Sequence, residues 1–175
     1  MFTIRWHSHA LKKRGENVKW QRRKRAKTVN NLIICDNKYN ILAISDCIDG
    51  NHHDNFEIIE NVKKMLQSLD EQLIDYDMSH LNADSGFDVL AFIDFIEKYG
   101  IVANIKQNKR NTKKTIPEYR YMSDYIYAFR FKIEVVFAWL DTYKRILVRF
   151  EQLAKNFKSW LFIAASMINF RHIFN

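Results

Sequence analysis

Two carboxylates in the sequence stand where metal-dependent chemistry is plausible. Asp84 follows a predicted short buried strand, residues 81–83, and precedes Gly86, which allows a tight turn because it lacks a Cβ. Such a strand tip is an open, rigidly supported position for a functional group. Glu134 lies in a predicted helix at 125–141. Carboxylate oxygens suffice as Mg²⁺ ligands, so the two residues on adjacent elements fit a two-metal phosphoryl-transfer site.

Both residues also have a simpler interpretation. Asp84 could cap a helix that begins near Phe87. On the predicted helix at 125–141, polar side chains recur at spacings of three, four and seven and so form one stripe. An Arg130–Glu134 ion pair on a solvated face would account for part of this stripe. The stripe comprises Tyr127, Arg130, Glu134 and Asp141.

Two basic stretches indicate a polyanionic partner. The net charge is +8 and the isoelectric point is near 9.5, which favours nucleic acid or an anionic membrane surface. Dense clusters of cations bind phosphates because binding releases condensed counterions. Trp20, within the first stretch, could stack on an unpaired base, although a solvated linker is the alternative. The candidate DNA-binding cations in these stretches are Arg22, Arg23, Lys24, Arg25, Lys109 and Arg110.

Composition predicts one helix-rich domain spanning 1–175, because aromatic residues are abundant (14%) and Gly (4) and Pro (1) are scarce. Two cysteines do not form a disulfide framework, and the longest apolar run, 160–165, is far shorter than the ~20 residues that a bilayer span needs. We therefore expect a cytoplasmic, nucleoid-associated protein without membrane contact. His52 and His53 are adjacent in a predicted loop and are not expected to bind zinc.

The elements alternate as in an α/β domain. We expect a short strand at 2–6, a hairpin from 32–35 and 41–44, and a helix capped by Asp54 that runs to Leu69. A strand at 81–83, a helix at 87–99 that Gly100 ends and a strand at 101–105 follow. From residue 123 the pattern is helical, with breaks near 142 and 156, and the last helix is expected to cover the sheet.

Several sequence pieces, in order, resemble bacterial insertion-sequence transposases with an RNase H-like DDE domain. This resemblance implies a mixed sheet flanked by helices, with a helical C-terminal part. It implies cleavage and joining of DNA strands in transposition and recombination, with Mg²⁺ or Mn²⁺ held by Asp84 and Glu134. The matching pieces are Lys-Thr-Val-Asn at 27–30, Ala-Ile-Ser at 43–45, Gly-Asn-His-His-Asp at 50–54, Leu-Asn-Ala-Asp-Ser-Gly-Phe-Asp at 81–88, Ala-Asn-Ile-Lys-Gln-Asn-Lys-Arg-Asn at 103–111, Ile-Glu-Val-Val-Phe-Ala-Trp-Leu-Asp at 133–141 and Leu-Val-Arg-Phe-Glu at 147–151.

The same resemblance implies further DNA contacts. Tyr127, Arg130 and Glu134 match a Tyr-x2-Arg-x3-Glu signature whose Tyr and Arg hold the phosphates of the transposon end. Asp141 stands where the family usually has a Lys, which leaves Lys144 as the nearest candidate. The implied partners are transposon ends and target DNA, and a homodimer on DNA is left open.

The resemblance fails at the family's first catalytic Asp. Aligning on Ser8 and His9 places Trp6 at that position, and Trp cannot ligate metal. Loss of this ligand predicts impaired activity in an N-terminally truncated transposase, with a non-catalytic DNA-binding remnant as the alternative. A basic RNA-binding protein is a third, unrelated class. None of the nearby carboxylates is expected to substitute, because the site tolerates only small displacements: Asp36, Asp46 and Asp49.

Overall fold

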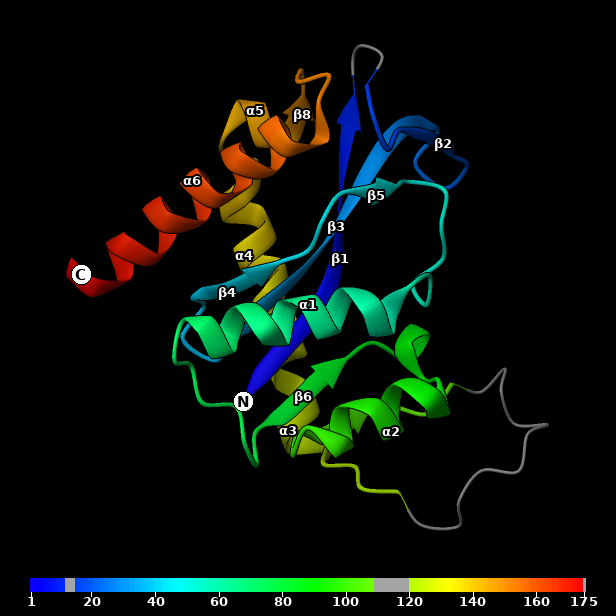
Figure 1. Cartoon of the computed structure of the whole chain (residues 1–175), viewed down its shortest axis with the longest axis vertical. Coiled ribbons are helices and arrows are strands. Elements are labelled where there is room, and N and C mark those ends of the chain that lie inside the picture. Colours follow the sequence, from blue (N-terminus) through cyan, green and yellow to red (C-terminus); the bar gives the residue numbers. More distant parts are fainter. Residues whose placement is uncertain (12–14, 109–119, 175) are drawn as a thin grey trace.

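A single mixed sheet organises the molecule, as the computed structural model shows for residues 1–11, 15–108 and 120–174 (Figure 1). In these ranges the sheet has 8 strands. Their bounds are β1 Phe2–Leu11, β2 Lys19–Gln21, β3 Ala26–Asp36, β4 Ile41–Ile44, β5 Ile48–Asp49, β6 His80–Ala83, β7 Val102–Ile105 and β8 Val148–Arg149.

Strand β1 lies at the centre of this sheet, in the order β2-β3-β1-β6-β7. It pairs antiparallel with β3 from Phe2↔Asp36 to Ala10↔Thr28 and parallel with β6, which in turn pairs parallel with β7. The arrangement confirms the predicted α/β, RNase H-like mixed sheet. The expected strand at 2–6 was too short, because β1 continues through His7 and His9, whose side chains are buried rather than part of a loop.

Helices cover both faces of the sheet (Figure 1). Helices α1 and α2 pack on one face and share a core with Ile4 and Leu32, whereas α4 and α6 pack on the other with Val29 and Ile33. Successive residues of β3 thus serve opposite cores, as the pleat requires. The bounds are α1 Ile58–Glu71, η1 Ser85–Phe87, α2 Leu90–Lys98, α3 Asp124–Ala128, η3 Phe129–Phe131, α4 Lys132–Asp141, α5 Lys144–Leu147 and α6 Ala154–Phe174.

The predicted hairpin and the predicted strands that correspond to β6 and β7 are confirmed. The predicted first residues of α1 and α2 are wrong. Helix α1 begins at Ile58 after Glu57, which has a left-handed backbone (φ 46°), so Asp54 is not its cap. The carbonyl oxygen of Asp54 instead accepts a hydrogen bond from Trp6 Nε1 at 2.8 Å. A 3₁₀ turn precedes α2, which starts only at Leu90.

The predicted helix at 125–141 is interrupted. Ser123 caps α3, the 3₁₀ turn η3 follows, and α4 begins at Lys132. The break near 142 is confirmed, whereas the break predicted near 156 lies earlier, because β8 and an irregular segment precede Ala154. Helix α6 packs on the sheet face as expected, and within the described ranges no helix is both long and apolar enough to cross a bilayer.

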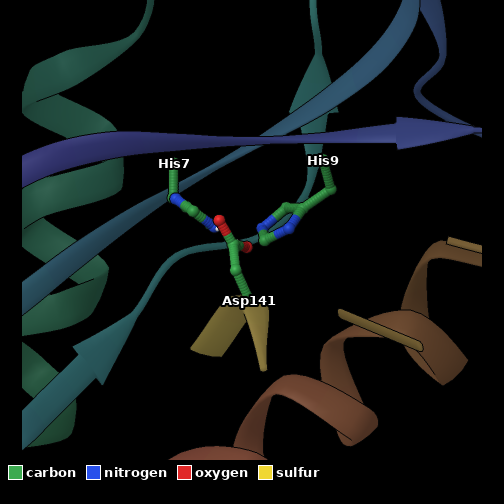
Figure 2. Close-up of side chains that lie close together, drawn as sticks. All are labelled: His7, His9 and Asp141. Atoms are coloured by element: carbon green, nitrogen blue, oxygen red, sulfur yellow. Dashed lines mark hydrogen bonds and ion pairs between the residues drawn. The ribbon is translucent and has the colours of Figure 1, made fainter. Parts of the chain in front are cut away.

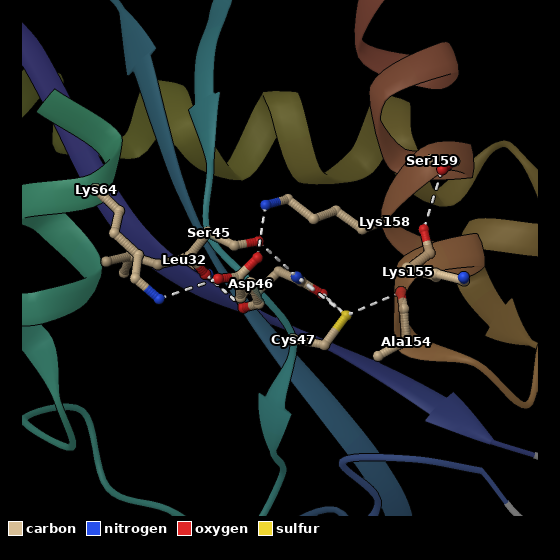
Figure 3. A network of polar contacts seen from close by, with 10 residues as sticks. Leu32, Ser45, Asp46, Cys47, Lys64, Ala154, Lys155, Lys158 and Ser159 are labelled. Atoms are coloured by element: carbon tan, nitrogen blue, oxygen red, sulfur yellow. Dashed lines mark hydrogen bonds and ion pairs between the residues drawn. The ribbon is translucent and has the colours of Figure 1, made fainter. Parts of the chain in front are cut away.

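Asp46 links the helices of the two faces at the end of β4 (Figure 3). Its carboxylate accepts a hydrogen bond from Lys158 of α6 at 2.7 Å and from Lys64 of α1 at 3.3 Å. These interactions lower the pKa of Asp46, with the Lys158 hydrogen bond as the main cause. Asp46 therefore connects α1 and α6 through ion pairs.

Candidate functional site

Asp84 lies at the tip of β6, immediately before η1. It occupies the N-cap position of this 3₁₀ turn, but its side chain makes no capping hydrogen bond. The carboxylate instead contacts two guanidinium groups, those of Arg5 and Arg130. The capping interpretation is therefore wrong, and Asp84 belongs to a cluster of charged side chains.

Arg5 of β1 joins the two predicted carboxylates. Its Nη1 lies 3.1 Å from Oδ2 of Asp84 and 2.5 Å from Oε1 of Glu134 on α4. The three side chains are 34%, 33% and 45% exposed, so water screens these ion pairs in part. Asp84 and Glu134 thus converge, as predicted, but around a cation supplied by the protein.

Trp6 does not stand between these carboxylates. Adjacent strand residues point to opposite faces, and Trp6 is paired with Leu32, whose side chain belongs to the α1–α2 core. Arg5 is paired with Ile33, whose side chain belongs to the α4–α6 core. The alignment on Ser8 and His9 puts Trp6 at the position of the family's first Asp, and a shift of one residue from Trp6 to Arg5 changes the face of the strand.

Arg130 binds Asp84 rather than Glu134. Its Nε lies 3.4 Å from Oδ1 of Asp84, and its guanidinium lies 4.4 Å from the ring centre of Tyr127 and 4.0 Å from that of Phe131. The alternative of an Arg130–Glu134 ion pair is therefore wrong. Burial raises the pKa of Tyr127, so its hydroxyl remains protonated and able to donate a hydrogen bond at neutral pH. Tyr127 and Arg130 lie together next to Asp84, in a position suited to an anionic ligand.

Two clefts open beside this charged cluster. One, of about 360 Å³, is lined by Glu134 and Asp141 of α4 together with Arg23 and Lys24. The other, of about 110 Å³, includes Asp84 and again Arg23. Both are lined mainly by polar surface, and Lys24 Nζ is held over β1 by a hydrogen bond to the carbonyl oxygen of Ser8 at 3.1 Å.

The other predicted cations are distributed unevenly. Arg22 and Arg25 share the turn between β2 and β3 with Arg23 and Lys24, so the first basic stretch reaches the carboxylates. Lys144 is an exposed residue of α5 and lines an apolar hollow against α6. It lines neither of the two clefts beside Asp84 and Glu134 that are formed by described residues. Lys109 and Arg110 lie outside the described residues.

The donor set of Asp84 and Glu134 does not fit Mg²⁺ in this chain. The ion needs several oxygen ligands, and in this site both carboxylates are engaged by one guanidinium. Arginine remains charged at all physiological pH values, so Arg5 cannot release its charge to make room for a second cation. Beside Asp84 and Glu134, β1 therefore supplies a positive charge.

Three residues close to the site were not predicted: Arg5, His7 and His9. They alternate along β1 and therefore lie on one face of the strand, towards α4. The period of two was visible in the sequence, but the predicted strand ended at residue 6, so the histidines were not assigned to it. A longer strand would have placed all three side chains beside Glu134 and Asp141.

Comparison with protein families gives a match over nearly the whole chain. The family model described as "Transposase DDE domain" matches residues 2–170, which include every element from β1 to most of α6. Comparisons with curated proteins and with solved structures gave no match. The family model agrees with the resemblance found in the ordered sequence pieces and with the topology of the sheet.

Proposed function

Because the chain belongs to the transposase DDE domain family, we propose that it binds DNA in transposition and is impaired in strand cleavage. Arg5 carries this proposal. It supplies a guanidinium at the point where Asp84 and Glu134 converge, with Nη1 at 3.1 and 2.5 Å from their oxygens. A site that needs carboxylates around divalent metal loses both a ligand and its negative charge by this replacement.

Arg5, rather than Trp6, corresponds in this proposal to the family's first Asp. The supporting observation is the face of β1 on which each side chain lies. Arg5 contacts both remaining acidic residues, whereas Trp6 donates a hydrogen bond to the carbonyl oxygen of Asp54. An acidic residue at position 5 would complete a cluster of three carboxylates, whereas one at position 6 would not.

DNA binding is supported by the cations around the two clefts. Arg23 lines both clefts, Lys24 lines the larger one, and Arg130 lies beside Asp84. Arginine and lysine at the rim of a cleft neutralise backbone phosphates without reading sequence. The net charge of +8 acts in the same direction by attracting polyanions.

The experiment is nicking of a supercoiled plasmid that carries the element's ends, in Mg²⁺ or Mn²⁺. Wild type, Arg5→Asp, Trp6→Asp and the double variant Arg5→Asp/Asp84→Asn are compared, with circular dichroism to verify folding. We expect nicking by Arg5→Asp alone, and its loss when Asp84 is also changed. Trp6→Asp is the matched control, because it adds the same carboxylate to the other face of β1.

Other outcomes separate the alternatives. Nicking by wild type that the added single variant Asp84→Asn abolishes would overturn the impairment. Nicking by Trp6→Asp but not by Arg5→Asp would show that Trp6 has replaced the ligand. If none of the folded variants nicks but all bind DNA, the chain is a non-catalytic DNA-binding remnant. Filter binding at two salt concentrations measures that property, and its absence would contradict the DNA-binding proposal itself.

A further inference from the structure

A second cluster of potential metal ligands lies on the same side of β1, beyond the Arg5 ion pairs. His7 and His9 project from β1, and Asp141 rises from the end of α4 between their rings (Figure 2). One ligand atom from each residue lies within 4.8 Å of the other two. His7 Nε2 and Asp141 Oδ1 are 2.9 Å apart.

The tautomer of His9 follows from its surroundings. Nδ1 lies 2.9 Å from the carbonyl oxygen of Ile146, which can only accept a hydrogen bond, so Nδ1 carries the proton and donates it. Nε2 is then the lone-pair nitrogen. It is buried and has no hydrogen-bond partner among the residues that the structure describes. Figure 2 shows a ring nitrogen of His9 turned towards Asp141.

An unpartnered buried nitrogen is uncommon and needs a physical explanation. The His9 residue is only 1% exposed, and burial of an ionised group away from water is costly, which favours the uncharged ring. The imidazole is therefore neutral and has a free lone pair. A buried lone pair without a partner is unfavourable, but a neutral imidazole with a free lone pair is the form of histidine that binds a metal ion.

We propose that His7, His9 and Asp141 bind one transition-metal ion of the zinc class, at a site separate from Asp84 and Glu134. Two imidazoles and a carboxylate suit zinc and related first-row ions, whereas Mg²⁺ prefers oxygen ligands. Ile146 supplies the outer hydrogen bond that orients a metal-bound histidine. Three protein ligands leave a fourth position, which faces the cleft of about 360 Å³ that His7 and Asp141 line.

Binding requires a small contraction of the cluster. Zinc–ligand bonds of about 2.0–2.2 Å bring ligand atoms closer together than the separations of up to 4.8 Å found in this cluster. Asp141 can move, since its side chain is 37% exposed and it is the last residue of α4. The His7 ring packs on Phe137 and the His9 ring on Phe157, so the two imidazoles are the fixed part of the site.

Nearby positive charges oppose the ion and set a limit on its affinity. Lys24 and Arg23 line the same cleft, and Lys24 and Arg149 both act on His9. Asp141 provides the opposing negative charge. Because cations of the protein remain close, the fourth position favours an anionic or phosphate-bearing ligand over a further metal ion.

The test uses the untagged full chain after removal of metals by a chelator. Calorimetry with Zn²⁺ and visible absorption with Co²⁺ should show one ion per chain, bound through nitrogen and oxygen ligands. His7→Gln and Asp141→Asn should each weaken binding by at least about 10-fold, which is the lower end of the loss produced by changing only an outer hydrogen bond of a metal ligand. His52→Gln is the matched control, because this histidine lies in the loop after β5 and stacks on Phe56.

The same experiment distinguishes the two carboxylate sites on α4. Glu134→Gln should leave Co²⁺ binding unchanged, since Glu134 contacts Arg5 and not the histidines. Wild-type affinity in both folded His7→Gln and Asp141→Asn would overturn the proposal, as would the absence of stoichiometric binding to wild type. His9→Gln should lose the most metal affinity, but His9 is buried and its substitution endangers folding. The test therefore relies on Asp141→Asn, because Asp141 is partly exposed.

Discussion

Arg5 of the central strand lies 2.5 Å from Glu134 of α4, and it places a permanent positive charge within a pair of acidic residues. The same nitrogen reaches Asp84 at the tip of β6, so one side chain connects three elements. All three side chains are partly exposed, and such ion pairs contribute only about 0–1 kcal/mol each to stability. Arg5 therefore changes the chemistry of the site far more than it changes the stability of the fold.

Substitution of Arg5 should create a response to Mg²⁺. In Arg5→Asp, three carboxylates face one another, and binding of the ion to the folded state raises the melting temperature. Wild type and Arg5→Met, which lack the third carboxylate, should show no Mg²⁺-dependent shift in a thermal melt. Mg²⁺ is the suitable ion because it binds weakly to imidazole, so the histidine cluster does not contribute. A shift of equal size in wild type would contradict the proposed role of Arg5.

The turn between β2 and β3 should account for part of the salt dependence of DNA binding. Removing two phosphate-binding cations with Arg23→Ala/Lys24→Ala lowers the slope of log K against log salt by roughly 2, at about 0.9 per phosphate. Fluorescence anisotropy with a labelled duplex at four salt concentrations measures this slope. Lys63→Ala/Lys98→Ala removes the same charge from exposed positions on α1 and α2 that line neither cleft, and should leave the slope unchanged. Equal slopes for both double variants would show that the DNA does not contact the turn between β2 and β3.

Most of the sheet could be predicted from the sequence, because short apolar runs bounded by turn residues mark β3, β4, β6 and β7. The first strand could not be, since its second half carries His7, Ser8 and His9, which are polar by type. The burial of His7 and His9 depends on α4 and α6, which supply Phe137 and Phe157 and follow more than a hundred residues later in the chain. The length of β1 is thus decided by tertiary packing rather than by local pattern.

The site could be predicted only in part for the same reason. Asp84 and Glu134 were identified by their types and surroundings, and the structure brings both to Arg5. Arg5 itself has no distinguishing local signal, because a basic residue in a basic chain is unremarkable until its strand register is known. The proposed assignment of the family's first Asp to Arg5 rather than to Trp6 is a shift of one residue, which changes the face of the strand.

Asp46 should make stability depend on pH in the acid range. Its pKa in the folded state lies below the ordinary value of 3.8, chiefly because of the hydrogen bond from Lys158. The stabilisation is therefore fully present above the unfolded pKa and is lost as pH falls through the folded pKa. Urea unfolding of wild type and Asp46→Asn should differ by less than about 1 kcal/mol at pH 7, since the side chain is 55% exposed, and this difference should shrink below pH 4. Asp94→Asn, at an exposed position of α2, is the control, and an acid-independent difference for Asp46→Asn would contradict the assignment.

Arg149 should be essential to the fold despite its charge. It is fully buried, and its Nε, Nη1 and Nη2 donate to the carbonyl oxygens of Glu151, Glu16 and Gln152 at 2.8, 2.9 and 2.9 Å. These bonds connect the end of β8 to the segment after β1, so Arg149→Met removes a charged donor from three carbonyl groups, of which that of Gln152 keeps the backbone N–H of Glu16 at 2.9 Å. We expect a loss of at least about 1.5–3 kcal/mol in the free energy of unfolding, which is the usual contribution of one hydrogen bond to a charged group.

A lysine cannot replace Arg149, because its single ammonium lacks the planar fork that reaches three acceptors at once. Arg149→Lys should therefore recover only a minor part of the loss. The matched control is Arg145→Met, which removes an equally charged side chain that is 59% exposed and pairs with Glu151 at 2.9 Å. Its cost should stay within about 1 kcal/mol, as for other exposed ion pairs. If urea unfolding gave equal losses for Arg145→Met and Arg149→Met, net charge rather than the buried hydrogen bonds would be what position 149 contributes to the fold.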